Sequence, residues 1–206
     1  MDDKSHTFLF ADLVGFTALA ELEGDDRALE VALALQRRVR ELLAPHHAEQ
    51  VKGTGDGMML RCTEPQAAIK LGLRLVEDLA AVEGFPPIRV GIHTGPALAN
   101  EGDWYGRTVN VAARLCAVAP GGEVMVSDST REAAGKMTGV QWGERELHWL
   151  RNVAEPVGTY LVASARVWED DVSASAESAA ERRWRIPWTC GRAAAGQVTG
   201  REVPAC

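Results

Sequence analysis

The sequence predicts an α+β fold: a ferredoxin-like (split βαβ) antiparallel sheet with added strands. Apolar residues follow two spacings along the chain, the alternation typical of strands and the longer spacing typical of helices. These spacings occur in the order strand, helix, strand, strand, helix, strand. The 206 residues are 46% hydrophobic and 25% charged, a size and composition that favour one core rather than two.

The elements of this unit are predicted from apolar spacing and turn residues. The segment TFLFADL is typical of a strand, and EQVKGTGDGMMLRC of two short strands around a glycine-rich turn. The segment PPIRVGIHTG predicts the last strand of the unit. The first helix is predicted to end at Pro45 from the spacing of Leu29, Leu33, Val39, Leu42 and Leu43, and the second from Ile69, Leu73, Val76 and Ala80.

Further elements are expected beyond this unit. They are a helix from about Arg107 to Ala119, a strand EVMVSD, a short helix, and strands in ELHWL and GTYLVA. Apolar periodicity is lost from about Glu169. We therefore expect one domain over residues 1–165 and a disordered C-terminal tail over residues 166–206.

Composition excludes several classes of protein. No apolar run approaches the roughly 20 residues of a membrane-spanning helix, and the N-terminal MDDKSHT lacks the features of a signal peptide. Four widely scattered cysteines favour neither a disulfide framework nor a zinc site and indicate a reducing compartment. We therefore expect a cytoplasmic protein without a membrane span.

The net charge of −7 is unevenly spread along the chain. Residues 182–206 hold five Arg and one Glu, so that residues 1–181 carry −11. Such an acidic body argues against nucleic acid as a partner. A polyanionic ligand would need a metal ion or a few well-placed basic groups.

Two carboxylates are expected to meet at one end of the sheet. Asp12 ends an apolar strand, and Asp56 lies in the turn KGTGDG. In a split βαβ unit with right-handed crossovers, the end of the first strand lies beside the turn that joins the second and third strands. Two like charges so close repel unless a cation lies between them, and oxygen ligands without Cys or His favour Mg²⁺ or Mn²⁺. The pair predicts a metal site, although Asp12 alone would favour a helix-capping role.

A second polar group lies in the segment GDWYGRTVNVAARL. Asn110 and Arg114 are four residues apart on a predicted helix and therefore share one face. Taken alone, this pair would be an ordinary exposed helix face. Asp103 would likewise be an ordinary turn residue.

Five segments considered together resemble the catalytic domain of class III nucleotidyl cyclases of the adenylate cyclase type. They are FADLVGFT, KGTGDG, GIHTG, DWYGRTVNVAARL and LRNVAEPV, which occur in the family's order from about Thr7 to Ala163. The resemblance implies that Asp12 and Asp56 are the metal-binding aspartates, with the carbonyl of Leu13 as a further ligand. It also implies the domain boundary expected above.

The same resemblance implies substrate-binding and catalytic roles. Lys52 and Asp103 match the pair that reads adenine, with Lys52 at the N1 side and Asp103 at the exocyclic amine. Asn110 and Arg114 match the residues that hold the ribose and stabilise the transition state at the α-phosphate. The remaining implied substrate-binding residues are Phe16, Thr17 and Arg151, the last in a segment that reads LRN where LKG is commoner.

The implied reaction converts ATP into 3′,5′-cyclic AMP and pyrophosphate. Two Mg²⁺ or Mn²⁺ ions per active site would activate the ribose 3′-hydroxyl and hold the triphosphate, with no nucleophilic side chain required. The family works as a head-to-tail dimer in which one subunit supplies the metal aspartates and the other the purine and transition-state residues. Because this chain carries both sets, we expect a homodimer with two shared sites. The question of a regulatory domain or partner outside this chain stays open.

Two alternatives remain. One is a guanylate cyclase, against which Lys52 and Asp103 argue, since a Glu in place of Lys52 would suit guanine. The other is a catalytically silent nucleotide-binding or dimerisation module, which would be expected to lack a metal Asp, the Asn or the Arg. None of these residues is missing here.

Overall fold

The computed structural model describes residues 5–53 and 55–165, and the expected C-terminal tail over residues 166–206 lies outside this range. The first half of the chain consists of β1 (Ser5–Leu13), α1 (Phe16–Glu23), α2 (Asp25–Leu43), a 3₁₀ turn (Ala44–His46), β2 (Ala48–Gly53), β3 (Gly57–Cys62) and α3 (Pro65–Ala80). The second half consists of β4 (Ile88–Pro96), β5 (Leu98–Asn100), β6 (Asp103–Tyr105), α4 (Arg107–Val118), β7 (Val124–Ser127), α5 (Asp128–Ala134), β8 (Val140–Trp142), β9 (Glu146–His148) and β10 (Val157–Ser164).

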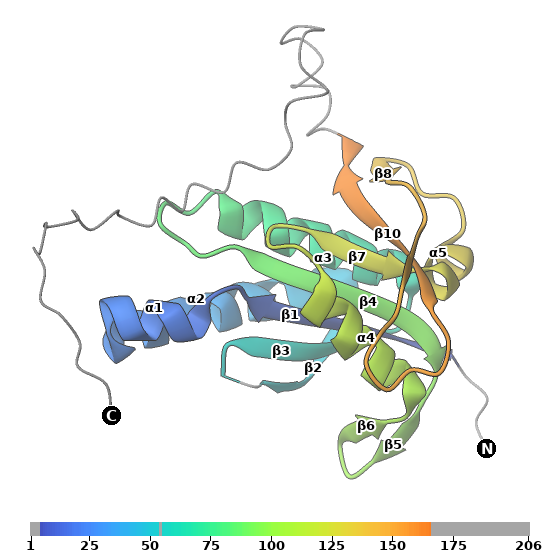
Figure 1. Cartoon of the computed structure of the whole chain (residues 1–206), viewed down its shortest axis with the longest axis horizontal. Helices are drawn as coiled ribbons and strands as arrows, with labels where there is room; N and C mark the ends of the chain where they lie inside the picture. The colour runs from blue at the N-terminus through green and yellow to red at the C-terminus, as the bar shows by residue number, and fades with distance from the viewer. Residues whose placement is uncertain (1–4, 54, 166–206) are drawn as a thin grey trace, which may run out of the picture.

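The predicted split βαβ unit is present. The main sheet has the order β2-β3-β1-β4-β7-β10-β8, with β9 also paired to β10, and β1 runs antiparallel to both β3 and β4 (Figure 1). The first four strands therefore have the order expected for a ferredoxin-like unit. The strands added beyond β4 make the sheet mixed, because β7 pairs with β4 in parallel after the chain crosses over through α4.

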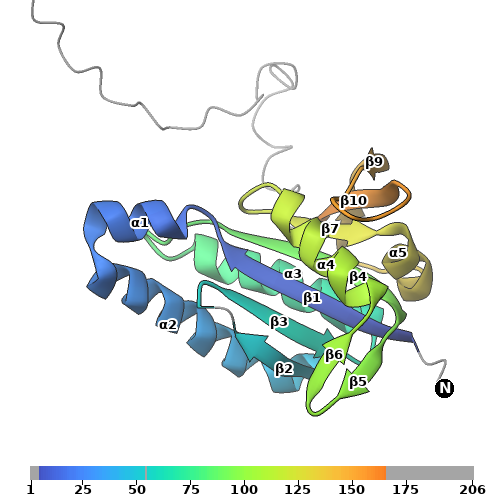
Figure 2. The ribbon, with the colours of Figure 1, turned by 60° about the horizontal axis from the view of Figure 1, so that its bottom comes forward.

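The alternation of side chains along β1 separates the two faces of the sheet. Leu9, Ala11 and Leu13 are buried in the main core together with apolar residues of α2 and α3. Phe8 belongs to a smaller cluster on the opposite face, together with residues of α4. Figure 2 shows α3 behind the sheet and α4 with the β5–β6 hairpin in front. Because alternate residues of a strand share a face, Asp12 lies on the same face as Phe8 and α4.

Helix α4 lies very close to β4. A Cβ atom at Gly91 would stand 2.1 Å from the backbone nitrogen of Cys116, and one at Gly95 would stand 2.8 Å from Oγ1 of Thr108. That hydroxyl donates a hydrogen bond to the Pro96 carbonyl at 2.5 Å. The glycines of GIHTG are therefore required so that the helix can pack directly on the strand.

Several elements differ from those predicted. The first helical region is divided at Gly24 into α1 and α2, and the hairpin β5–β6 and the strand β8 were not predicted. Although α2 ends close to the predicted position, Leu29 and Leu33 are 57% and 44% exposed. The buried face of α2 instead consists of Ala28, Val31, Ala32, Leu35, Val39 and Leu42.

Two expectations from composition bear on the location of the protein. In the part of the chain that the structure describes, no helix has both the length and the apolar character needed to cross a membrane. Cys62 and Cys116 are buried and free. Burial raises the pKa of each thiol to about 12, so both are inert at neutral pH.

We expect Gly91→Ala to destabilise the fold by about 1–3 kcal/mol, because the added methyl group would overlap the backbone of α4. Urea unfolding would measure the loss. Gly53→Ala is a suitable control, since its Cβ would meet atoms only at 3.8 Å and 3.9 Å. Equal stability of Gly91→Ala and the wild type would contradict the close packing of α4 on β4.

Candidate active site

Asp12 and Asp56 come from segments that meet at one end of the sheet. Asp12 lies opposite Gly57 in the β1–β3 ladder, and the backbone N–H of Leu13 donates to the Asp56 carbonyl oxygen at 3.1 Å. The side chain of Asp12 is 26% exposed. The structure thus brings together the two segments that the topology predicted to meet, and it leaves the Asp12 carboxylate accessible.

Asp12 also has a cationic partner, Arg89, which the sequence argument missed. Arg89 lies opposite Asp12 in the β1–β4 ladder, and its Nε and Nη2 donate to Oδ2 of Asp12 at 2.9 Å and 2.6 Å. Its Nη1 donates to the carbonyl of Ala117 in the last turn of α4, at 2.9 Å. Arg89 on the neighbouring strand thus supplies part of the charge that balances Asp12, where a metal ion alone was expected.

Lys52 and Asp103 form an ion pair across 51 residues of sequence. Nζ of Lys52 donates to Oδ2 of Asp103 at 2.6 Å, and the backbone N–H of Trp104 donates to Oδ1 at 2.8 Å. The hydrogen bond from Lys52 has the largest effect in lowering the pKa of the Asp103 carboxyl group, and the one from the Trp104 backbone has a smaller effect. The pair therefore presents one fixed cation and one fixed anion side by side at the surface.

Asn110 and Arg114 share the exposed face of α4. The opposite face of the helix buries Val109, Ala112 and Cys116 against the sheet, as predicted. Because this buried face is packed on β4, the backbone that carries Asn110 and Arg114 is held rigidly. Among the described residues, no hydrogen bond or ion pair joins either of them to Asp12 or Asp56.

The other implied substrate residues lie at the ends of elements. Phe16 and Thr17 begin α1, which follows Gly15 in the left-handed conformation at φ 75°. The first backbone N–H groups of a helix are unpaired within it and attract anions. Arg151 is exposed in the loop before β10, immediately after Leu150, which packs in a buried cluster with Val111 of α4.

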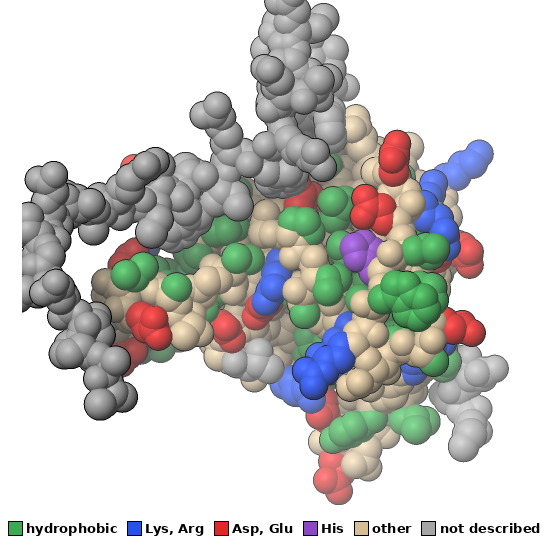
Figure 3. All heavy atoms as spheres, in the orientation of Figure 1, with side chains coloured by type: hydrophobic (Ala, Val, Ile, Leu, Met, Phe, Trp, Pro, Cys, Tyr) green, Lys and Arg blue, Asp and Glu red, His purple; other side chains and the backbone are tan. Residues whose placement is uncertain are grey.

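Basic side chains are present on the face that carries α4 although the chain as a whole is acidic. In Figure 3, Lys and Arg side chains lie on this face between α1 and the β5–β6 hairpin. A few well-placed cations are what a polyanionic ligand would need to approach this protein.

The donors at Asp12 and Asp56 fit a hard divalent cation. Carboxylate and carbonyl oxygens are the ligands that Mg²⁺ and Mn²⁺ prefer. Within the described part of the chain, no cluster of three or more His, Cys, Asp or Glu could hold a metal ion by itself. An ion bound here would therefore take its remaining ligands from substrate phosphates, water or backbone oxygens, as Mg²⁺ commonly does.

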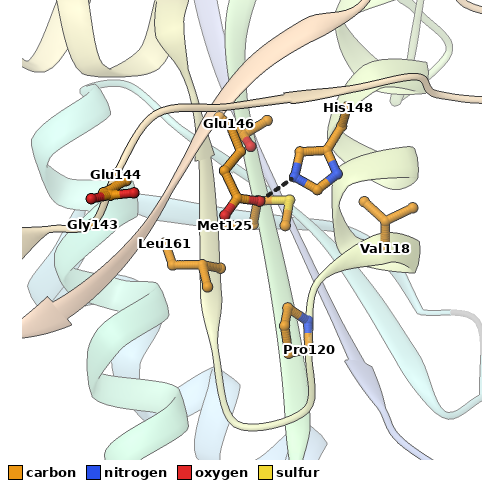
Figure 4. A pocket seen from close by; sticks show the side chains of 9 residues that line it. Val118, Pro120, Met125, Gly143, Glu144, Glu146, His148 and Leu161 are labelled. Atoms are coloured by element: carbon orange, nitrogen blue, oxygen red, sulfur yellow. Dashed lines mark ion pairs between the residues drawn. The ribbon is translucent and has the colours of Figure 1, made fainter. Parts of the chain in front are cut away.

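The pocket drawn in Figure 4 is a different place in the fold. It has a volume of about 160 Å³ and lies beyond the C-terminal end of α4, where it is lined by Val118, Met125 and His148 among others. Glu144 and Glu146 also line it, and Glu146 pairs with His148 at 3.5 Å. None of the predicted site residues lines this pocket, and its acidic lining disfavours a triphosphate.

His93 is the histidine of GIHTG, and its environment is structural. Its Nδ1 lies 2.8 Å from Oγ of Ser127 and 3.2 Å from Oγ of Ser129. Burial, with a smaller contribution from the charge of Arg107, lowers the pKa of His93 to about 4. The ring is therefore neutral at physiological pH. Its contacts with Ser127 and Ser129 link β4 to the start of α5.

Comparison with solved structures agrees with this fold. An adenylate cyclase structure from Trypanosoma brucei, described in the monomeric state, superimposes with a TM-score of 0.68 at 25% identity, covering 77% of this chain and 88% of that one. The adenylyl cyclase CyaB from P. aeruginosa gives a TM-score of 0.68 at 21% identity and covers 79% of this chain and 95% of that one. The second likeness bears on the fold alone.

Comparison with known sequences identifies the family. The chain is 40% identical to the pH-sensitive adenylate cyclase of Mycobacterium tuberculosis over 151 residues, which are 70% of this chain and 38% of that protein. It is 36% identical to an adenylate cyclase of Streptomyces griseus over 126 residues, or 61% of this chain and 32% of that protein. This chain thus spans about a third of the length of these relatives. The sequence model of the adenylate and guanylate cyclase catalytic domain matches residues 2–163, and the chain therefore belongs to that family.

Proposed function

We propose that this chain is an adenylate cyclase, which converts ATP into 3′,5′-cyclic AMP and pyrophosphate. The observation that carries the proposal is the ion pair of Lys52 and Asp103, which stands on the same face of the molecule as the carboxylate Asp12. Relatives that are 35–40% identical and carry the name adenylate cyclase support it. A cytoplasmic location, suggested by the free cysteines, is part of the proposal.

The ion pair suits adenine better than guanine. Lys52 can donate only, and Asp103 in its ionised form can accept only. Adenine offers an acceptor at N1 and a donor at its exocyclic amine, which matches this pair. Guanine offers an N–H at position 1 and a carbonyl at position 6, so both contacts would be mismatched. Guanylate cyclase activity is the second candidate and is disfavoured by this geometry.

The end of the sheet that carries Asp12 and Asp56, here called the metal end, would position the triphosphate. Two Mg²⁺ or Mn²⁺ ions, when bound by Asp12, Asp56 and the Leu13 carbonyl, would supply Lewis acidity toward the 3′-hydroxyl and the phosphates. Arg89 would then have a phosphate oxygen as an alternative partner to Asp12, since its guanidinium stands beside the same carboxylate. The N–H groups of Phe16 and Thr17, in the first turn of α1, would donate hydrogen bonds to a phosphate.

The exposed face of α4 would act on the reacting atoms. The Asn110 amide would orient the ribose, and the Arg114 guanidinium would stabilise the charge that develops at the α-phosphate. Arg151 would contact the β- and γ-phosphates. No described side chain needs to act as a covalent nucleophile, because phosphoryl transfer relies on orientation and electrostatics.

We further propose that each active site is shared by two copies of the chain in a head-to-tail homodimer. Within one chain, Asn110 and Arg114 make no hydrogen bond or ion pair with Asp12 or Asp56 among the described residues. A two-fold axis would place the α4 face of one copy against the metal end of the other and would create two equivalent sites. This chain carries both the metal aspartates and the purine and transition-state residues, which supports identical partners.

We expect ATP with Mg²⁺ or Mn²⁺ to yield cyclic AMP and pyrophosphate, with GTP turned over at least about tenfold less efficiently, because its base edge mismatches Lys52 and Asp103. Product chromatography with both nucleotides and both metals would test this. A preference for GTP would establish the guanylate cyclase alternative. Nucleotide binding without any product would favour the silent module.

We expect Asp12→Asn and Asp56→Asn each to lower metal-dependent activity at least about a hundredfold, because each removes a charged ligand from a site that stabilises charge. Weakened Mn²⁺ binding, followed by electron paramagnetic resonance, should accompany the loss, while circular dichroism stays unchanged. Asp25→Asn, which alters an acidic residue in the first turn of α2, is the control. Wild-type Mn²⁺ affinity in either site variant would refute the metal assignment.

A further inference from the structure

The residue proposed to read the exocyclic amine, Asp103, stands on a very small element. It begins β6, which pairs with β5 to form a two-stranded hairpin of three-residue strands, separate from the main sheet. Strand β5 is exposed along its whole length, and Leu98 is 63% exposed. An isolated two-stranded hairpin of this size is marginally stable, so its position must depend on contacts with the rest of the domain.

Trp104, the next residue, anchors the hairpin to the sheet. Its ring packs against the cluster that contains Phe8 of β1 and Val109 of α4. The centroid of the ring is 5.6 Å from that of Phe8 and 4.4 Å from that of His6, both of which belong to β1. Large aromatic side chains of this kind contribute much of the packing energy at such contacts.

Arg61 holds the ring of Trp104 from a third strand. Its guanidinium carbon lies 4.8 Å from the ring centroid, in a cation–π arrangement. The guanidinium is itself oriented, since Nη1 donates to Glu49 at 2.8 Å and Nε donates to Nδ1 of His6 at 3.4 Å. The Arg61 side chain is only 18% exposed. The cluster therefore links β1, β2 and β3 to the hairpin.

Trp104 also helps to orient the carboxylate of Asp103. The backbone N–H of Trp104 donates to Oδ1 of Asp103, while Lys52 of β2 binds Oδ2. Displacement of the Trp104 ring would move this N–H and with it one of the groups that orient the carboxylate. Lys52 would stay in place, because it is part of the main sheet.

We propose that Trp104 and Arg61 are positioning residues that determine purine selectivity, acting through Asp103. This inference rests on the proposed function, in which Asp103 accepts from the exocyclic amine of adenine. Neither residue is assigned a contact with the nucleotide. They hold Asp103 at a fixed place beside Lys52, so that the two groups match adenine as a pair and mismatch guanine as a pair.

The test measures kcat and KM for ATP and GTP in Trp104→Ala, Trp104→Phe and Arg61→Lys. In Trp104→Ala we expect the KM for ATP to rise about tenfold and the preference for ATP over GTP to fall by a similar factor, since a small misplacement is costly. The kcat at saturating ATP should change much less. Trp104→Phe, which keeps an aromatic anchor, should recover most of the preference, and Arg61→Lys, which loses the planar stack, should be intermediate.

Leu98→Ala is the matched control, because it alters an exposed residue of the same hairpin. It should leave both KM and the nucleotide preference unchanged. Thermal unfolding identifies any variant that fails to fold, and for a misfolded Trp104→Ala the decision rests on Arg61→Lys. An unchanged preference in folded Trp104→Ala or in Arg61→Lys would overturn the inference, as would a loss confined to kcat.

A binding measurement separates this inference from the proposed function. Calorimetry with 3′-deoxy-ATP and 3′-deoxy-GTP, which cannot cyclise, gives the base preference without turnover. If the wild type makes no cyclic nucleotide but binds the adenine analogue more tightly, the proposed enzyme activity fails. In that case, the inference still requires the preference to fall in Trp104→Ala. Equal preference in that variant and in the wild type would refute it.

Discussion

The register of β1 between β3 and β4 is the constraint on which the site depends. Asp12 stands opposite Gly57 on one side and Arg89 on the other. A slip of one residue would turn the carboxylate into the core where Leu13 now packs, and would expose the leucines. Burial of Leu9, Ala11 and Leu13 therefore determines the face on which Asp12 stands, so that packing energy holds a polar group at the end of the strand.

The second constraint is the contact of α4 with β4, which brings a helix onto the same face as Asp12. Gly91 permits this approach, and Arg89 on the same strand joins the Asp12 carboxylate to the carbonyl of Ala117 at the end of α4. One strand thus holds both the proposed metal end and the helix with the proposed transition-state residues. Among the described residues, no hydrogen bond or ion pair joins Asn110 or Arg114 to Asp12 or Asp56, which is compatible with a site completed by a second copy.

Sequence reasoning predicted the features that depend on local periodicity and on topology rules. The meeting of the Asp12 and Asp56 segments follows from strand order alone, and the shared face of Asn110 and Arg114 follows from helical spacing. Arg89 was missed because its place opposite Asp12 depends on a register between residues 77 apart, and Trp104 because three-residue strands carry no periodic signal. Leu29 and Leu33 misled the assignment of the buried face because α2 has apolar residues on two sides.

Complementation between two inactive variants tests the shared site most directly. Asp12→Ala removes a proposed metal ligand, and Asn110→Ala removes a proposed ribose contact on α4. Equal amounts of the two, mixed under conditions in which subunits exchange, should recover about a quarter of wild-type activity, since half of randomly formed dimers are mixed and each has one intact site. No recovery, with exchange shown independently by labelled subunits, would mean that each chain builds its active site alone.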